Sequence, residues 1–421
     1  MNITSLSAHE VLASGGFPTL EVTARLDSGE SGTASVPYGA SAGSHEATVL
    51  MDKDATRWQG QGMLQAAQNV ITRLAPVVQG MDASDQRRID EKMIELDGTP
   101  NKAELGGNAI LAVSLAVARA AASALKKPLY QHIIDTYQTG VDLQVLPHPM
   151  VVAIEGGKHA DNTTDLQEFC FLGLEPKSPT ESIRVALECY HSLKKVLHTE
   201  GLSTNVGNEG AFAPSNIAGN ETPLQYMMTA VQNAGYTPGK EVGFAIDAAA
   251  NEFYKDGLYQ MRLEGKSLSS VEMISYYSSW LEKYPILSVE DLLAEDDWDN
   301  WSLLKKMTDQ HGVMLIGDDL TVTNSQRLQK AIDLDAISAI LIKLNQIGTL
   351  TETVDCCMLA RSHSMNTVTS HRGGGETNDT AMVDLAVAVG SSYIKVGPTR
   401  GERVAKYNRL MEIERELQNK F

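Results

Sequence analysis

Four charged residues stand directly after apolar, β-branched stretches of the sequence. These residues are Asp247, Glu290, Asp318 and Lys343. Three carboxylates crowded into an apolar setting repel one another, so their pKa values would rise unless a cation balanced them. Oxygen donors of this kind select a hard cation, Mg²⁺ first and Mn²⁺ as the alternative. A lysine beside such an ion loses its proton more readily and can act as a base.

The spacing of these residues indicates how the fold would bring them together. Glu290 and Asp318 are 28 residues apart, and Asp318 and Lys343 are 25 apart. Each interval suits one strand–helix–strand unit, which needs about 30 residues. Strands that are apolar on both faces belong in a parallel sheet, and in a closed barrel their C-terminal ends meet at one mouth. The competing interpretation, surface acids and a solvated lysine, is disfavoured because all four follow stretches of buried type.

Eight candidate strands follow residue 146, and most end in charged residues. They are residues 150–154, 166–172, 242–247, 286–290, 313–317, 339–342, 367–370 and 393–395. We therefore predict an α/β fold, in which a TIM-type eight-stranded barrel spans residues 138–421. Strand patterns up to about residue 57, then helical patterns to about 135, predict an N-terminal α+β domain over residues 1–137.

Composition narrows the class of protein. The net charge of −18, from 53 acidic and 35 basic residues, disfavours a nucleic-acid or membrane-surface partner. The four cysteines lack the spacing of a zinc site, so we interpret them as buried thiols in a reducing compartment. No signal peptide is apparent, and the apolar stretch 109–125 is interpreted as a buried helix rather than a membrane span. These features favour a cytoplasmic protein.

The sequence resembles the enolase family from about residue 3 to the end. The resemblance is carried by motifs in both predicted domains. They are Gly-Ala-Ser41-x-Gly-x-His-Glu-Ala, Leu-Asp-Gly-Thr-x-Asn-Lys, Gly-Gly-x-His159-Ala, Gln167-Glu168-Phe, Gly-x-Glu209-Gly, Glu290-Asp, Gly-Asp318-Asp, Lys343-x-Asn-Gln-Ile-Gly-Thr, Ser-His371-Arg372 and Ile-Lys395-x-Gly.

This resemblance implies reversible dehydration of 2-phosphoglycerate to phosphoenolpyruvate with two Mg²⁺ ions per site. It implies that Lys343 removes the proton next to the substrate carboxylate and that Glu209, with Glu168 nearby, protonates the departing hydroxyl. We expect the Glu168 charge to raise the pKa of Glu209, because an acid must stay protonated to donate. In the same scheme Asp247, Glu290 and Asp318 hold the first Mg²⁺, Ser41 helps to hold the second, Arg372 binds the phosphate, Lys395 binds the carboxylate, and His159, Gln167 and His371 line the site.

The sequence departs from the family pattern around the substrate. Ser370-His-Arg-Gly373-Gly-Gly-Glu-Thr is one residue longer than the usual motif and replaces its phosphate-binding serine with Gly373. Restoring a serine there is expected to tighten binding of the phosphate end, if the loop reaches the substrate. Tyr38 replaces a serine of the mobile loop, and the stretch 13–18 lacks an arginine usual at the dimer interface.

Two alternatives therefore stay open beside the implied reaction. The chain could act on a related phosphate- or phosphonate-bearing carboxylic acid, or it could be a non-catalytic binding protein with this fold. The retained Lys343 and Glu209 speak against the second alternative. The expected partners are a small phosphorylated acid and other copies of the chain, as a homodimer or higher homo-oligomer.

Overall fold

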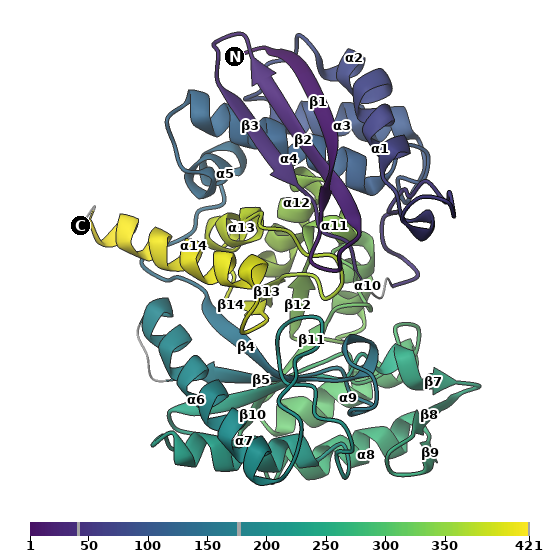
Figure 1. Cartoon of the computed structure of the whole chain (residues 1–421), viewed down its shortest axis with the longest axis vertical. Coiled ribbons are helices and arrows are strands. Elements are labelled where there is room, and N and C mark those ends of the chain that lie inside the picture. Colours follow the sequence, from purple (N-terminus) through teal and green to yellow (C-terminus); the bar gives the residue numbers. More distant parts are fainter. Residues whose placement is uncertain (40–42, 175–177, 420–421) are drawn as a thin grey trace.

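The computed structural model describes residues 1–39, 43–174 and 178–419. Figure 1 shows an N-terminal domain, with a three-stranded sheet and several helices, stacked on a larger barrel domain. The barrel is closed and has eight strands. The chain thus has the predicted α/β architecture, a TIM-type barrel with an N-terminal domain.

The N-terminal domain packs one long helix against an antiparallel sheet. The strands are β1 (Ile3–Leu12), β2 (Pro18–Leu26) and β3 (Ser31–Ser35), and α4 (Gly107–Ala124) packs on β2 and β3. Gly32 allows this close approach, because a Cβ there would lie 2.2 Å from the backbone nitrogen of Ala120. The other described helical segments of this domain are a 3₁₀ turn (Trp58–Gly60), α1 (Leu64–Asn69), a π-helical turn (Val70–Leu74), α2 (Ala75–Val78), α3 (Gln86–Asp97) and α5 (Leu129–Tyr137).

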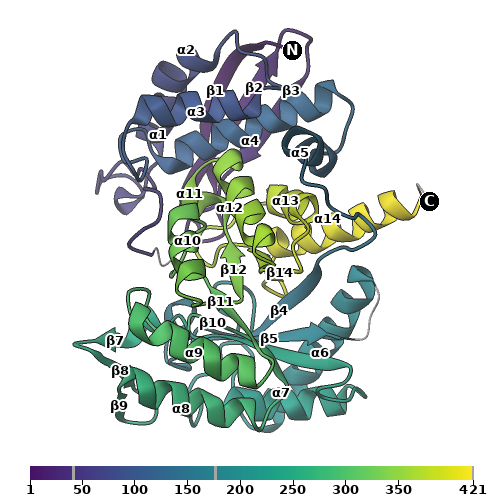
Figure 2. The same cartoon turned by 180° about the vertical axis from the view of Figure 1, so that it is seen from behind.

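Helix α4 is a core helix. It is long and apolar enough to cross a membrane by length and composition, but 83% of that window is buried inside the protein. Figure 2 shows it between the N-terminal sheet and the helices α11 (Leu344–Ile347) and α12 (Leu350–Ser362), which belong to the barrel domain. Its apolar surface is therefore covered by protein on several sides, as expected for residues 109–125.

The barrel closes in the order β10-β11-β12-β13-β14-β4-β5-β6. Its strands are short and almost entirely buried, which explains their apolar sequences. Their bounds are β4 (His148–Glu155), β5 (Glu168–Gly173), β6 (Val242–Asp247), β10 (Ile286–Glu290), β11 (Met314–Gly317), β12 (Ala339–Ile342), β13 (Asn366–Ser370) and β14 (Tyr393–Val396).

One strand corrects the expectation of an all-parallel barrel. Strand β5 runs antiparallel to both β4 and β6. The connection 156–167 contains a single 3₁₀ turn and no crossover helix, whereas parallel neighbours need a long crossover. The reversal brings the first residue of β5, Glu168, to the mouth, where it pairs with Glu155 and Asp247, the last residues of its neighbours.

Helices surround the barrel, and a small sheet fills the long interval between β6 and β10. That sheet, of β7 (Tyr254–Lys255), β8 (Leu258–Met261) and β9 (Lys266–Leu268), is the insertion that this interval leaves room for. The other helices are α6 (Pro179–Thr199), α7 (Thr222–Asn233), α8 (Ser270–Leu281), α9 (Trp298–Gln310), α10 (Ser325–Asp333), α13 (Ala381–Val389) and α14 (Gly401–Gln418).

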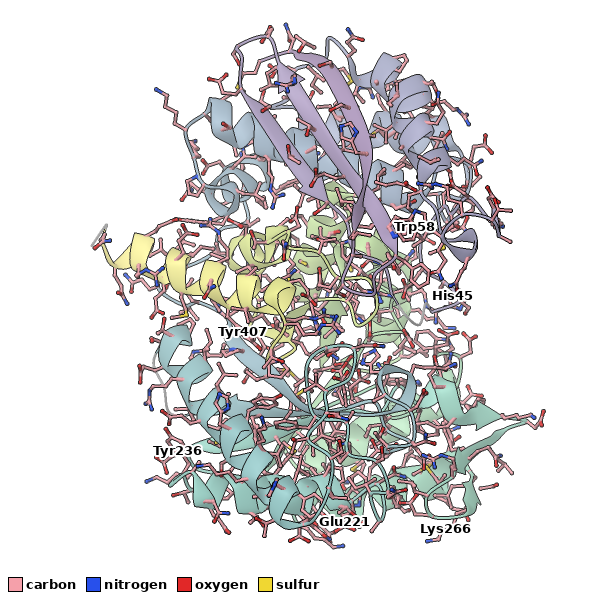
Figure 3. The ribbon with its side chains drawn as sticks, viewed as in Figure 1. His45, Trp58, Glu221, Tyr236, Lys266 and Tyr407 are labelled. Carbon is pink, nitrogen blue, oxygen red and sulfur yellow. The ribbon has the colours of Figure 1, made fainter. Side chains whose placement is uncertain are left out.

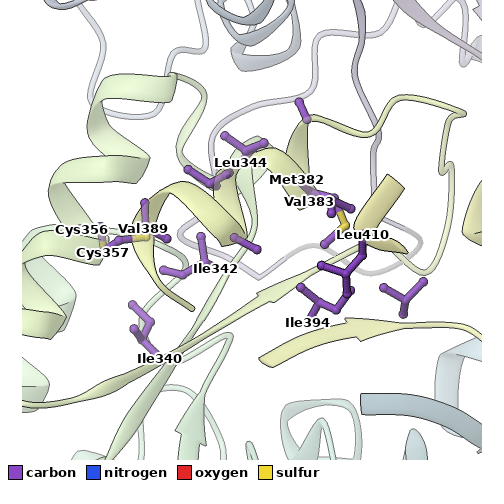
Figure 4. Packing of buried hydrophobic residues seen from close by; sticks show 14 of the residues in the cluster. Ile340, Ile342, Leu344, Cys356, Cys357, Met382, Val383, Val389, Ile394 and Leu410 are labelled. Carbon is purple, nitrogen blue, oxygen red and sulfur yellow. The ribbon is translucent and has the colours of Figure 1, made fainter. Parts of the chain in front are cut away.

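The apolar core continues from the strands into the surrounding helices. Figure 4 shows Ile340 and Ile342 of β12 near Val389 of α13, with Cys356 and Cys357 of α12 beside them. All four cysteines are buried and free, as predicted. Burial raises the pKa of the Cys357 thiol well above its usual value, so these thiols serve as apolar packing groups.

Candidate active site

The predicted site residues come together at the mouth of the barrel. Asp247 and Glu290 end adjacent strands and face each other in register, while Asp318 and Lys343 directly follow β11 and β12. A cavity lies here. Ten predicted residues line it: His159, Gln167, Glu168, Glu209, Asp247, Asp318, Lys343, His371, Arg372 and Lys395. Glu290 is not part of this lining but contacts Lys395, which is, and Ser41 lies outside the described residues.

Lys395 connects three carboxylates. Its Nζ atom lies 2.7 Å from Glu290 Oε1, 3.0 Å from Asp247 Oδ2 and 3.1 Å from Glu168 Oε2. Burial lowers the pKa of Lys395, but these acids raise it well above the usual lysine value. Burial, followed by the Asp247 charge, raises the pKa of Glu290 well above its usual value, as expected for crowded carboxylates.

Lys343 forms an ion pair with Asp318, with 2.5 Å between Nζ and Oδ2. Burial lowers the pKa of Lys343, but the charges of Asp318 and Glu290 raise it, and the net result is a pKa above the usual lysine value. The protein's own groups therefore hold the proton on Lys343, the opposite of the shift expected beside a divalent cation. Asp318 also accepts a 2.8 Å hydrogen bond from Gln346 Nε2.

The turn after β11 is positioned by Asp291, a residue to which the sequence analysis assigned no role. Its two carboxylate oxygens accept hydrogen bonds from the backbone N–H groups of Asp318, at 3.0 Å, and Asp319, at 2.7 Å. These three acids bring ligand atoms within 4.8 Å of one another, a spacing that could hold a metal ion. Asp291 follows the predicted ligand Glu290 directly, and this adjacency is the signal that could have found it.

Glu209 lies among two histidines and a second glutamate. His371 Nε2 is 3.1 Å from Glu209 Oε2, and His159 Nδ1 is 3.4 Å from Glu209 Oε1 and 3.3 Å from Glu168 Oε1. Burial raises the pKa of Glu209, but the two histidines outweigh it and hold the pKa below the usual glutamate value. The expectation of a raised pKa for Glu209 is therefore wrong, because the histidine charges oppose that of Glu168.

The loop that carries Glu209 is held by Glu155, the last residue of β4. Glu155 accepts hydrogen bonds from the backbone N–H groups of Glu209 and Ala211, both at 3.0 Å. Burial and the Glu209 charge raise the pKa of Glu155 to about 8. Sequence analysis gave Glu155 no role, although its position at a strand end, like those of Asp247 and Glu290, was the available signal.

Arg372 lies at the boundary between the two domains. Its Nη1 atom is 3.1 Å from Oε1 of Glu46, which is only 8% exposed and belongs to the N-terminal domain. The backbone N–H of Arg372 donates to Glu376, and Arg403 donates to the Arg372 carbonyl oxygen. Glu46 and Glu376 were not predicted as site residues, although Glu46 lies in the motif that contains Ser41 and Glu376 lies in the one that contains Arg372.

Gln167 completes the lining near the β6 strand end. Its Nε2 atom donates a long hydrogen bond of 3.4 Å to Asp247 Oδ2, and the side chain is 7% exposed. Gln167 thus lies beside the same carboxylate that Lys395 contacts. Its amide can orient Asp247 and can also contact a bound molecule in the cavity.

Two family models together match nearly all of this chain. The model described as the enolase N-terminal domain matches residues 3–133. The model described as the enolase C-terminal TIM barrel domain matches residues 143–421. The chain belongs to the enolase family. The acids, lysines and histidines at the mouth therefore lie in the barrel domain of an enolase-family protein, and the acidic groups there could bind a metal ion.

The departures from the enolase pattern lie together in the structure. A Cβ on Gly373 would lie 2.3 Å from His159 Nε2 and 2.8 Å from Glu209 Oε1, so a serine does not fit without movement of these buried groups. A Cβ on Gly375 would lie 2.2 Å from the Tyr38 ring. Tyr38 and Gly375 also exchange two backbone hydrogen bonds, of 3.0 and 2.8 Å. The extra glycine, the lost serine and Tyr38 are therefore parts of one rearranged contact.

Proposed function

We propose that this enolase-family chain catalyses the Mg²⁺-dependent, reversible dehydration of 2-phospho-D-glycerate to phosphoenolpyruvate, as a hydro-lyase of glycolysis and gluconeogenesis. The observation that supports it most is that a largely buried lysine, Lys343, and a fully buried glutamate, Glu209, line the same cavity. Dehydration of a hydroxy acid needs a base for the proton next to the carboxylate and an acid for the departing hydroxyl group. Both must be within reach of one small molecule.

The proposed Mg²⁺ site rests on the chemistry of the donor set. Asp247, Glu290 and Asp318 offer only oxygen donors, which suit a hard cation, and all three are at least 95% buried. These residues would hold one ion, and Ser41 would contribute to a second. Bound Mg²⁺ supplies positive charge that stabilises the extra negative charge developing on the substrate carboxylate.

In the proposed reaction, Lys343 takes the proton from the carbon next to the carboxylate. Glu209, supported by His159 and Glu168, gives a proton to the hydroxyl group, which leaves as water while the carbon–carbon double bond forms. Lys395 and Arg372, which line the cavity with Gln167 and His371, bind the carboxylate and phosphate of the substrate. Each proton removed or supplied is thus assigned to a residue at the mouth.

The protonation of the free protein suits the reverse direction. The pKa of Lys343 is raised and that of Glu209 is lowered, which favours an ammonium and a carboxylate. In hydration of phosphoenolpyruvate, a protonated Lys343 gives its proton to carbon and an ionised Glu209 accepts one from water. Because the same pair serves both directions, these pKa directions are compatible with a reversible enzyme.

A second candidate is favoured by the rearranged contact at Gly373. An enolase-like enzyme acting on a related phosphate- or phosphonate-bearing acid would need a differently shaped phosphate end, and this loop lies directly against His159 and Glu209. The third interpretation, a non-catalytic binding protein, is disfavoured by the base and acid in one cavity.

The deciding experiment is a steady-state assay of the purified chain. We expect phosphoenolpyruvate to form from 2-phosphoglycerate with Mg²⁺, and expect no formation with chelator or with Lys343→Ala. If wild type produces no more than Lys343→Ala, the proposed reaction is wrong. Turnover of a phosphonate-bearing acid by the same preparation would then support the second candidate.

We further propose a cytoplasmic location and a homodimer or higher homo-oligomer. The four buried free thiols are compatible with a reducing compartment. The proposed oligomer is supported only by the fact that dimers are usual in the enolase family. Size-exclusion chromatography with light scattering would test the oligomeric state. A monomeric mass would exclude the proposed homo-oligomer.

A further inference from the structure

A histidine and two carboxylates lie together beside the mouth, outside the groups used in the proposed reaction. The ligand atoms of His45, Glu295 and Asp296 all lie within 4.8 Å of one another. His45 Nε2 is 3.5 Å from Asp296 Oδ1. His45 belongs to the N-terminal domain, whereas the two acids belong to the loop between β10 and α9. Figure 3 places His45 at the side of the molecule, where the two domains meet.

Glu295 supplies the observation that indicates a ligand. It is 6% exposed, and its Oε1 atom accepts a 2.5 Å hydrogen bond from Ser44 Oγ. Its Oε2 atom is buried and has no hydrogen-bond partner among residues 1–39, 43–174 and 178–419. A buried carboxylate oxygen without a partner is destabilising, and a bound cation would remove that cost.

The donor set differs from that of the mouth. One imidazole nitrogen and two carboxylates suit a borderline cation such as Zn²⁺ better than Mg²⁺, which prefers oxygen donors alone. Asp296 is 67% exposed and His45 is 39% exposed, so both side chains can rotate to shorten their distances to an ion. Water can complete the coordination from the exposed side.

Arg327 is a positive group beside this cluster. Arg327 Nη2 donates to the Glu295 carbonyl oxygen at 3.0 Å and lies 3.6 Å from Asp296 Oδ1. The arginine thus holds the backbone of the loop, and its contact with the Asp296 side chain is long. Two carboxylates beside this arginine leave a net negative charge near the imidazole of His45.

We propose that His45, Glu295 and Asp296 form a binding site for a divalent transition-metal cation, Zn²⁺ by preference, separate from the proposed Mg²⁺ site. The bound ion would join residues 43–46 to the β10–α9 loop. Glu46, the residue after His45, faces Arg372 across the domain boundary. Zn²⁺ would therefore restrain the segment that carries this partner of Arg372.

The test counts Zn²⁺ bound per chain by equilibrium dialysis in excess Mg²⁺. The variants are His45→Ala and Glu295→Gln, and the matched control is His363→Ala. His363 is exposed, and its described hydrogen bonds go to Ser362 and Leu359 rather than to acids. We expect wild type and the control to bind one Zn²⁺ that both cluster variants lose. Equal Zn²⁺ binding by all four proteins would overturn the proposal.

A further variant separates this site from the proposed active site. Asp318→Asn removes a proposed Mg²⁺ ligand and leaves the cluster intact. We expect it to keep the Zn²⁺ that His45→Ala loses. Loss of that Zn²⁺ in Asp318→Asn would mean that the ion binds at the mouth, and would also overturn the proposal. Unchanged Mg²⁺ affinity in Asp318→Asn would instead count against the proposed Mg²⁺ site alone.

Discussion

Glu46 and Arg372 form a buried ion pair that joins the N-terminal domain to the barrel, with 3.1 Å between Oε1 and Nη1. The two side chains are 5% and 4% exposed. Glu46 also accepts a 3.1 Å hydrogen bond from the backbone N–H of Gly43. Arg372, which is expected to bind phosphate, therefore takes part of its charge balance from the other domain, beside Asp318 and Asp319 of its own.

The first prediction concerns the loss of this pair. Glu46→Ala is expected to lower the free energy of unfolding by about 3 kcal/mol, because removing one partner of a buried ion pair costs about that much. Urea unfolding measures the change. The control is Glu104→Ala, whose pair with Arg73 is exposed and should contribute less than about 1 kcal/mol. Equal effects of the two substitutions would show that Glu46 does not balance Arg372.

The second prediction concerns residue 373. Gly373→Ser would tighten phosphate binding if the loop reached the substrate, but its Cβ would press on His159 and Glu209. We now expect kcat to fall by about 100-fold, because displacement of a catalytic group by about 1 Å has an effect of that order. The control is Gly401→Ser, where a Cβ would meet nothing within 4 Å. An unchanged kcat with a lower KM for substrate would restore the original expectation.

The third prediction concerns Asp318. Asp318→Asn is expected to weaken Mg²⁺ binding on the order of 100-fold, since even outer partners of metal ligands contribute 10- to 100-fold to affinity. Calorimetric titration with Mg²⁺ measures this change. Asp335→Asn is the control, because the Asp335 side chain is 79% exposed and pairs only with Lys305 among described residues. Equal Mg²⁺ affinity in both variants would remove Asp318 from the ligand set.

The sequence was sufficient to predict the barrel and most residues of its mouth. Asp247, Glu290 and Lys343 each follow or end an apolar strand, and strand ends of a barrel meet by geometry. The reversed β5 was not predictable from periodicity, because a buried strand is apolar in either direction. Its direction depends on the short connection 156–167, and Glu168 reaches the mouth at the start of its strand rather than at the end.

The pKa shifts could not be predicted from spacing. The sequence indicated that Glu168 and Glu209 are near each other, but the shift of Glu209 depends on how close His159 and His371 lie. Likewise, the role of Gly373 depends on a close contact with side chains far away in the sequence. Such distances are set by tertiary packing, and no local pattern records them.

The fourth prediction concerns Asp90, which lies buried where α3 meets the barrel domain. Its Oδ2 accepts a 3.0 Å hydrogen bond from the backbone N–H of Thr351 in α12, and its Oδ1 accepts one of 3.0 Å from Gln86. Burial raises the pKa of Asp90 from 3.8 to about 6. Because the folded protein holds this proton more tightly than the unfolded chain, the resulting stability is complete below pH 4 and is lost as pH rises through about 6.

A shift of this size corresponds to roughly 3 kcal/mol of unfolding free energy. Asp90→Asn carries no titrating group, so its free energy of unfolding should lack this component. We expect the stability of wild type relative to Asp90→Asn to fall by up to about 3 kcal/mol between pH 4 and pH 7. Urea unfolding of both proteins at several pH values measures the difference. If the free energies of unfolding of wild type and Asp90→Asn changed with pH in parallel, Asp90 would have the same pKa in the folded and unfolded chain. The interface between α3 and α12 would then hold Asp90 ionised, and the prediction would be wrong.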